Sequence, residues 1–491
     1  MSKFFGDLRP FQKAEFLLMV FLAFAVPLSW LAAQYFEVAL FVCALLKVIF
    51  DQRFKMNEGQ MRFKWVYIVY ALTWLVYLVG MIHTENQQEG WAQVSKKLGF
   101  LVFPLIFLFS DMSYLTKDRV RVICYAFVSG CVLFFLINLM PAIYDVVFKG
   151  ADSSRFFDQQ LMKYYYVHHS YMSMYVTFAM VFCVVEILKQ DSLKLKMTDS
   201  VVAIMMMVFV FLLDSRAGLL FMFLEIIALW IWITFVEKKK KFGMISMGTL
   251  VFILVLVGVV APNVYSRVAV TIKNLTAEDR TDRRVVQLRG SLSACEENWL
   301  FGVGSGDRSE AIMASFLRYR EKLVEEIVPV EDADRHEFEQ GRAVVLQKIM
   351  ELSDYDGWNE MNKKTFRFIE EKSAEYKCDA ESVRRVASEY IYISNAIYHE
   401  LNTHNQYIDT MISAGVVGLL LLLAYFLIPL VFCIRTRRFD MVFFSFLFLV
   451  GFNAMFESVF EVQKGIIFFC FFNALLFYMS FRPNNSLELK V

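Results

Sequence analysis

The chain has 491 residues, of which 58% are hydrophobic and 51 are Phe. A water-soluble fold of this size could not bury so much apolar surface, so the composition excludes an ordinary soluble protein and makes the bilayer the main solvent. Charged residues make up only 20% of the chain and fall in short clusters between apolar runs, and the formal net charge of +1 identifies no partner by itself.

The apolar runs predict an all-α polytopic membrane protein. A spanning helix needs roughly 20 mostly apolar residues, and the chain contains about twelve such runs. The first follows a basic start and lacks a small-residue cleavage site, so we expect a retained signal anchor. In chain order, the predicted spans lie at residues 15–33, 35–50, 65–82, 98–110, 120–141, 170–188, 200–213, 217–236, 243–261, 410–432, 439–455 and 465–481.

The loops between these runs predict the orientation of the chain. With a cytoplasmic N-terminus, the Lys and Arg clusters all fall in inside loops and the short outside loops are poor in positive charge, as the positive-inside rule requires. We therefore expect both termini to be cytoplasmic. The predicted parts are a bundle of about nine spans at 1–261, a periplasmic insertion at 262–409, and about three spans at 410–491.

The insertion is polar from about Arg267 to His399, and its few glycines and prolines predict a folded helical cap rather than a disordered linker. Two cysteines, Cys295 and Cys378, lie in it and could pair in an oxidising compartment, although their spacing alone favours two free thiols. The predicted helices lie near residues 310–326, 333–352, 363–376 and 380–397.

Two groups of arginines are predicted to lie at the outer membrane face. Arg216 is the only basic residue of a sharp turn between two apolar runs. It could simply extend to the lipid headgroups, but a planar guanidinium also suits bidentate phosphate binding, and we favour that role.

The other group leads into a Gly-rich stretch at 299–306, and it comprises Arg280, Arg283, Arg284 and Arg289. That stretch lacks the strand–turn–helix context of a dinucleotide fingerprint, so we expect tight turns there.

A histidine motif precedes a late span on the same side. A lone His404 would usually be structural, but beside Asn405 at the outer mouth of the bundle a neutral imidazole could take a proton from an attacking hydroxyl. His399 and His404 are spaced i, i+5 and do not share a helical face, so we reject a zinc site. The outer loop after the first span has no Asp-Xaa-Asp, so a divalent-cation mechanism has little support. Smaller outer-face signals, which could be ordinary loop polarity, are His168, His169, Glu457, Glu461 and Gln463.

Taken together, these segments resemble the O-antigen ligase and polymerase family. SRAGLL (215–220) resembles the family's Arg-Xaa-Gly turn, and RRVVQLRGSLSACEENWLFGVGSG (283–306) resembles its arginine-led segment ending in a glycine pair. HNQYIDTMISAGVVGLLLLLAYF (404–426) resembles the motif that opens a late span. FESVFEVQKG (456–465) is similar to the Glu-containing turn before the last span, and HHSY (168–171) to a His-Pro-Xaa-Tyr element, with Ser170 in place of proline.

The resemblance implies a GT-C-type, metal-independent, inverting glycosyltransferase of the bacterial inner membrane that needs no cofactor and uses undecaprenyl diphosphate-linked glycan as donor. Arg216 and Arg284 would bind the diphosphate and stabilise it as it leaves, and His404 would orient or deprotonate the acceptor hydroxyl. Residues expected to bind substrate are Arg280, Arg283, Asn405, His169 and Glu457. The other expected partners are membrane lipids and a lipid A-core or glycan acceptor, with no nucleic acid.

Several alternatives remain open at this point. The sequence favours an O-antigen ligase only modestly over a polymerase, and a protein O-oligosaccharyltransferase would share the same chemistry. A lipid-glycan transporter without chemistry is an alternative of another class. A transporter should have broken or charged helices near the bilayer midplane and often internal repeats, whereas these polar groups cluster at one face.

Overall fold

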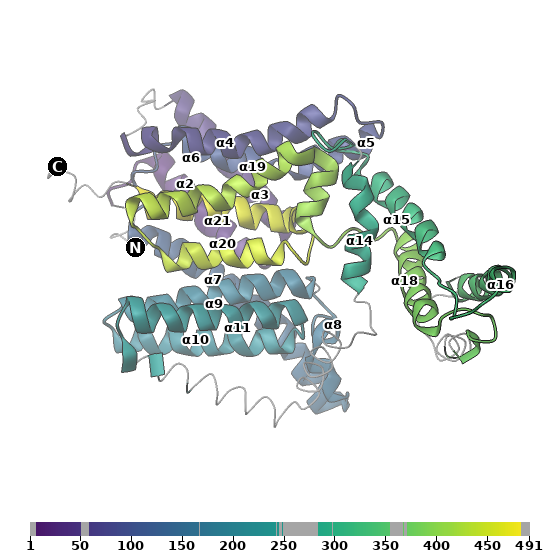
Figure 1. The fold of residues 1–491 in the computed structure, drawn as a ribbon. Coiled ribbons are helices and arrows are strands. Elements are labelled where there is room, and N and C mark those ends of the chain that lie inside the picture. The colour runs from purple at the N-terminus through teal and green to yellow at the C-terminus, as the bar shows by residue number, and fades with distance from the viewer. Residues whose placement is uncertain are drawn as a thin grey trace.

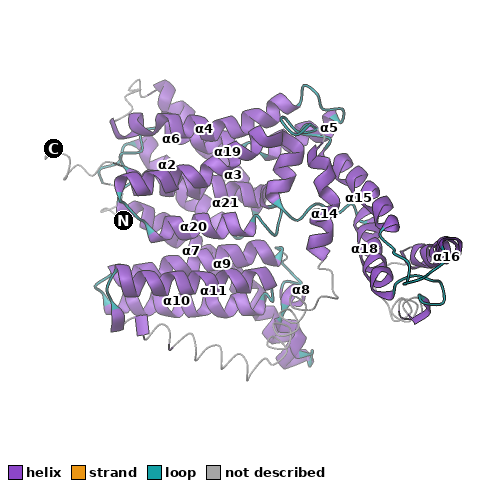
Figure 2. Cartoon of the chain, in the orientation of Figure 1, coloured by secondary structure: helices purple, strands orange, loops and turns teal. Residues whose placement is uncertain are grey.

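The computed structural model describes residues 6–50, 58–165, 167–241, 243–244, 248, 283–296, 298–353, 367 and 371–482. Within these ranges the chain is helical, and the β-pairing is limited to an isolated bridge between Pro329 and Cys378 (Figure 2). Figure 1 shows a bundle of long helices, with the helices of the insertion projecting from one end of it. The expectation of an all-helical membrane protein is thus confirmed.

The transmembrane part contains two groups of helices separated by the insertion. The first group comprises α2 (Pro10–Ala25), α3 (Trp30–Phe50), α4 (Glu58–Gly80), α5 (Gln87–Lys96), α6 (Gly99–Phe109), α7 (Lys117–Lys149), α9 (His169–Lys189), α10 (Leu193–Leu212) and α11 (Arg216–Ile231). The second comprises α19 (Gln406–Thr436), α20 (Met441–Asn453) and α21 (Gln463–Phe481). Short helices connect them at Ser153–Phe156, at Asp158–Leu161 (α8), at Trp232–Val236 (η2) and at Val459–Glu461 (η3).

In the described part of the chain, nine helical spans are long and apolar enough to cross a membrane, and α20 is shorter. The predicted span at 243–261 lies almost wholly outside the described residues. The span predicted at 98–110 is longer than expected, because the polar helix α5 precedes α6 and extends it to Gln87–Phe109.

One predicted boundary is wrong. The first helix ends at Ala25 and not near residue 33, and a new helix begins at Trp30 after a turn. Pro27 explains the break, because proline disfavours the helical conformation of the residue before it and has no N–H to donate. Ser29 then helps to start α3, since its hydroxyl accepts a hydrogen bond from the Ala32 N–H at 3.3 Å.

Helices α9 and α21 form the centre of the bundle, where aromatic rings pack closely. Phe468 of α21 lies 4.6 Å from Tyr175 of α9, and Phe472 lies 5.2 Å from Phe178, measured between ring centroids. Edge-on and tilted contacts of this kind have specific geometry and fix the two helices relative to one another. The N-terminal ends of both helices, near which the candidate site lies, are therefore held by a rigid core.

The insertion contains the helices α14 (Arg283–Glu296), α15 (Arg308–Glu325), α16 (Arg335–Ser353) and α18 (Ala380–Tyr398). Three of its predicted helices are confirmed, the prediction at 363–376 lies mostly outside the described residues, and α14 was not expected. The helices pack through small apolar clusters, one of which joins Val286, Phe316 and Ile393 to Ile412 of α19. Cys295 and Cys378 are both free thiols.

Helix α19 is broken at Gly415, and the Gly-rich stretch fills the break. Gly415 has φ 62° and ψ −165°, which interrupts the helical hydrogen bonding. The Val303 N–H donates to the Ile412 carbonyl at 2.8 Å, and the Val416 N–H donates to the Trp299 carbonyl at 2.9 Å. Irregular backbone at membrane depth requires protein partners of this kind. The expected tight turns are present, since Gly302 and Gly304 have φ of 75° and 109°.

We expect Gly415→Ala to lower the stability of the protein by about 3 kcal/mol, because a non-glycine residue is strained at this φ and ψ and its Cβ would overlap the Leu300 carbonyl. Thermal unfolding in detergent would measure the loss. Gly150→Ala is the matched control, since Gly150 also has positive φ but no atom lies within 4 Å of the added Cβ. Equal melting temperatures for the two variants would contradict the prediction.

Candidate functional site

The carboxylate of Glu457 joins residues from distant parts of the chain at the end of the bundle that carries the insertion. Glu457 lies in the turn between α20 and η3 and is buried. Its Oε1 accepts hydrogen bonds from the Ser170 hydroxyl at 3.0 Å and from the Arg284 guanidinium at 3.2 Å. The Nδ1 atom of His404 lies 3.4 Å from its Oε2. The structure thus brings together His404, Arg284 and Glu457, three of the residues that the sequence singled out.

His404 is held in a conformation that points its ring toward Glu457. Its φ of 49° is in the left-handed region, which is strained for a residue with a side chain, and its N–H donates to the Asn402 Oδ1 at 3.1 Å. An ionised Glu457 facing Nδ1 favours the tautomer with the proton on Nδ1, which leaves the Nε2 lone pair available. Because the imidazole is 30% exposed, Nε2 can meet a substrate hydroxyl.

The charges around Glu457 keep this carboxylate ionised. Burial alone raises the pKa of Glu457, but the hydrogen bond and charge of His404, together with Arg284, hold it below its ordinary value. His168 lies in the same surroundings, and burial lowers its pKa although Glu457 acts in the opposite direction. An anionic carboxylate that holds one nitrogen of an imidazole is the arrangement that a general base requires.

We expect His168 to make folding stability depend on pH. The pKa of His168 in the folded protein lies below its ordinary value of 6.5. As the pH falls below 6.5, the unfolded chain therefore takes up this proton more readily than the folded protein, and the free energy of unfolding decreases. The slope attributable to one proton is at most about 1.4 kcal/mol per pH unit. Melting temperatures between pH 7 and 5 should fall less in His168→Gln than in wild type. His399→Gln, at an exposed histidine, should retain the wild-type slope.

Arg284 is placed at the rim of the site by the first turn of α14. Its side chain is 40% exposed, and its guanidinium lies 5.9 Å from the centre of the Phe456 ring as well as against Glu457. Contact with an aromatic face and a carboxylate fixes the plane of the guanidinium. An anion that approached this rim would therefore meet an oriented fork of N–H donors.

The Arg216 turn packs on the same helix that provides Ser170. The Ser215 hydroxyl accepts a hydrogen bond from the Gly218 N–H at 3.2 Å, and a Cβ on Gly218 would overlap Ser173 of α9. Glycine thus permits close approach of α11 to α9 at this point. Arg216 begins α11, but its side chain, like that of Arg283, lies outside what the structure describes, as does Arg280 altogether.

The two remaining predicted residues have structural partners. The Asn405 Oδ1 accepts hydrogen bonds from the Tyr407 and Ile408 N–H groups at 3.0 and 3.1 Å, which caps α19, and its Nδ2 donates to the Met455 carbonyl. His169 stacks on His168 with ring centroids 4.4 Å apart, and its Nδ1 lies 3.5 Å from Asp158 Oδ1. Asn405 positions the turn that follows His404.

A buried charge network beside the site was not expected from the sequence. Arg308 of α15 donates to Asp409 of α19 at 2.8 Å and lies 3.6 Å from Glu461, which in turn accepts from Lys97 at 3.1 Å. Four segments of the chain therefore meet at this network, and its two cations balance its two buried carboxylates. No local motif marks Arg308, because its partners lie far away in sequence.

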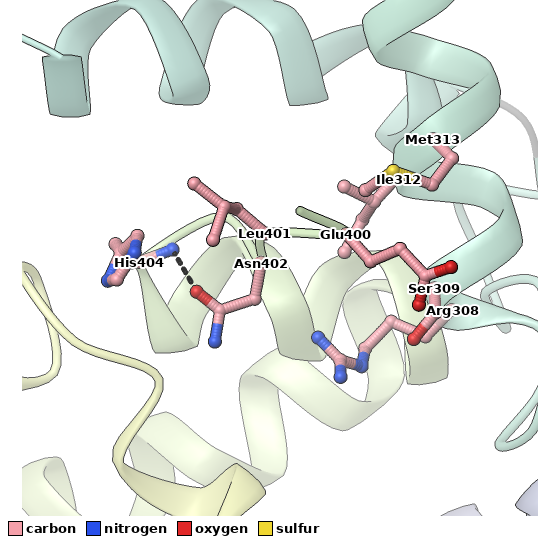
Figure 3. Close-up of a pocket in the computed structure, with 8 residues that line it drawn as sticks. All are labelled: Arg308, Ser309, Ile312, Met313, Glu400, Leu401, Asn402 and His404. Carbon is pink, nitrogen blue, oxygen red and sulfur yellow. Dashed lines mark hydrogen bonds between the residues drawn. The ribbon is translucent and has the colours of Figure 1, made fainter. Parts of the chain in front are cut away.

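A cavity of about 290 Å³ lies on the insertion side of His404. Figure 3 shows His404 at one side of the cavity and α15 with Arg308 at the other, with the loop at 400–404 between them. The cavity combines a carboxylate, an amide and a hydroxyl with apolar side chains. Its lining residues are Arg308, Ser309, Ile312, Met313, Glu400, Leu401, Asn402 and His404.

Comparison with known families gives one match. The model of the O-antigen ligase family matches residues 201–330, a range that contains Arg216, Arg284 and Arg308 and ends before His404. No curated protein matches the chain.

Proposed function

We propose that this chain moves glycan from undecaprenyl diphosphate to a lipid A-core acceptor, and the match of residues 201–330 to the model of the O-antigen ligase family supports this reaction. The observation that carries the proposal is the carboxylate of Glu457, which lies within reach of both His404 and Arg284. It connects a base for the acceptor with a cation for the donor in one site. The proposed location is the periplasmic face of a bacterial inner membrane, with about twelve spans and both termini in the cytoplasm.

His404 is the proposed general base. Its Nε2 takes the proton of the acceptor hydroxyl while that oxygen attacks the anomeric carbon, and Glu457 stabilises the imidazolium that forms. Glu457 does not touch substrate in this proposal, and it acts by orienting His404. The Ser170 hydroxyl holds the same carboxylate from α9.

Arg284 and Arg216 are the proposed ligands of the donor diphosphate. The bond between the anomeric carbon and the diphosphate oxygen breaks as the new glycosidic bond forms, so negative charge grows on the leaving group. Guanidinium groups stabilise the charge of the leaving diphosphate more strongly than the charge of the intact donor. Because the transition state gains more than the bound donor, the activation barrier falls. Attack from the side opposite the diphosphate inverts the anomeric centre, and no metal ion or other cofactor is needed for this step.

A transporter remains the alternative of another class, and the break in α19 is the observation in its favour, since broken spans occur at transport sites. Here, however, the freed backbone groups are paired with residues 299–304 and not left to face a cavity. The convergence of a histidine, an arginine and a shared carboxylate at one end favours an enzyme.

The test is glycan transfer by the purified protein in proteoliposomes that contain undecaprenyl diphosphate-linked glycan. Lipid A-core, a second lipid-linked glycan and a protein rich in Ser and Thr serve as parallel acceptors. We expect a covalent product with lipid A-core and an inverted anomeric configuration by NMR. A product with the second lipid-linked glycan would indicate a polymerase, and glycan movement without any covalent product would overturn the proposal in favour of transport.

A further inference from the structure

The cavity beside His404 has no role in the reaction as described so far. We propose that it binds the terminal sugar of the acceptor and presents the attacking hydroxyl to His404, an inference that rests on the proposed glycan transfer. The position supports this role, because His404 lines the cavity while its Nδ1 lies 3.4 Å from Glu457, the carboxylate that also pairs with Arg284. The imidazole thus connects the cavity with the carboxylate that holds the proposed donor ligand Arg284.

The charge of the cavity does not suit a diphosphate. Its cation, Arg308, is only 11% exposed, and its charge is balanced by Asp409 at 2.8 Å and Glu461 at 3.6 Å. Glu400 is exposed on the same cavity and forms no ion pair with any residue in the described ranges. A neutral to acidic cavity repels a diphosphate and accepts hydroxyl groups.

The shape and the polar groups fit a sugar ring. The Asn402 Oδ1 accepts a hydrogen bond from the His404 N–H, and the amide nitrogen of this lining residue is a further hydrogen-bond donor. Glu400 and Ser309 provide further hydrogen-bonding atoms, and Ile312 and Met313 provide an apolar surface for ring carbons. The volume of about 290 Å³ lies near the lower limit of ligand pockets, which suits one terminal sugar rather than a long glycan.

The loop that carries these groups is held in a strained conformation. Glu400 and His404 both have φ of 49°, although neither is glycine. Strain of this kind persists only where the surroundings enforce it, and it concentrates at functional sites. Here it turns a carboxylate and the proposed base toward the same cavity.

The experiment is to fill the cavity from α15. Ser309→Trp places a large ring in it, and Glu310→Trp, one position along the same helix and not part of the lining, is the matched control. Initial rates in proteoliposomes are measured with lipid A-core and with undecaprenyl diphosphate-linked glycan varied in turn. We expect the KM for lipid A-core to rise on the order of tenfold in Ser309→Trp, with the donor KM unchanged and Glu310→Trp like wild type.

Glu400→Gln is the second variant, since an exposed, isosteric change leaves folding intact, and it should raise the acceptor KM several-fold. Wild-type acceptor KM in both Ser309→Trp and Glu400→Gln would overturn this inference while transfer itself continues. A rise confined to the donor KM would instead assign the cavity to the donor. Absence of transfer by the wild type would overturn the proposed function, and this inference with it.

Discussion

Replacing His404 by Ala should lower the rate of glycan transfer by about 10²–10⁴, the usual contribution of a positioned general base. The physical reason is that Nε2 is the proton acceptor oriented by Glu457, whose Oε2 lies 3.4 Å from Nδ1. Transfer in proteoliposomes at saturating donor and acceptor measures the effect as kcat. His399→Ala is the control, because His399 is exposed on the preceding loop and outside the cavity lining.

A double variant tests whether Glu457 acts through His404. Glu457→Gln keeps a hydrogen-bonding group but removes the charge that stabilises the imidazolium, so its kcat should lie between those of wild type and His404→Ala. If Glu457 acts through His404, the double variant should be scarcely slower than His404→Ala, since residues that work as a unit are not additive. Multiplicative losses, or full activity of His404→Ala in a folded protein, would contradict the assignment of the base.

Replacing Arg284 by Ala should lower kcat by about 10²–10³, as expected when one group that stabilises transition-state charge is removed. Arg284 is 40% exposed at the rim of the site, where its guanidinium can reach a lipid diphosphate. Arg284→Lys should recover only part of the loss, because an ammonium cannot bind two phosphate oxygens in one plane.

Arg289→Ala provides the matched control for this prediction. Arg289 lies on the same helix, and its side chain is 52% exposed and pairs with Glu389 at 3.5 Å. Arg289→Ala therefore removes the same positive charge as Arg284→Ala, but at a position that does not contact Glu457. Binding of undecaprenyl diphosphate to each variant separates donor affinity from chemistry. Equal losses in Arg284→Ala and Arg289→Ala would show that general positive charge, and not a positioned guanidinium, supports the reaction.

The sequence predicted the helical membrane fold well because the bilayer imposes long apolar runs. The boundary near residue 33 was wrong, because the run from Phe16 to Ala33 is apolar on both sides of Pro27, so that hydropathy alone could not show the turn. The resemblance to the O-antigen ligase family was also predictable, and the model of that family matches residues 201–330. That match rests on segments whose spacing and residue types are visible without a structure.

The site was predictable in part. His404, Arg284 and Glu457 were recognised individually, but their connection through one carboxylate depends on packing between α9, α14 and the turn after α20. Ser170 was noted only as a departure from the expected proline, whereas its hydroxyl is a partner of Glu457. Arg308 was missed because nothing local in the sequence distinguishes this buried arginine from the exposed arginines of the insertion.

The pairing of α19 with residues 299–304 has a consequence for biogenesis. The loop leaves the ribosome more than a hundred residues before α19 is complete. The new span is interrupted at Gly415 and lacks four of its backbone hydrogen bonds until residues 299–304 dock on it. Completion of α19 thus depends on a segment that is synthesised earlier, so that the folding of the insertion and of the last three helices is coupled.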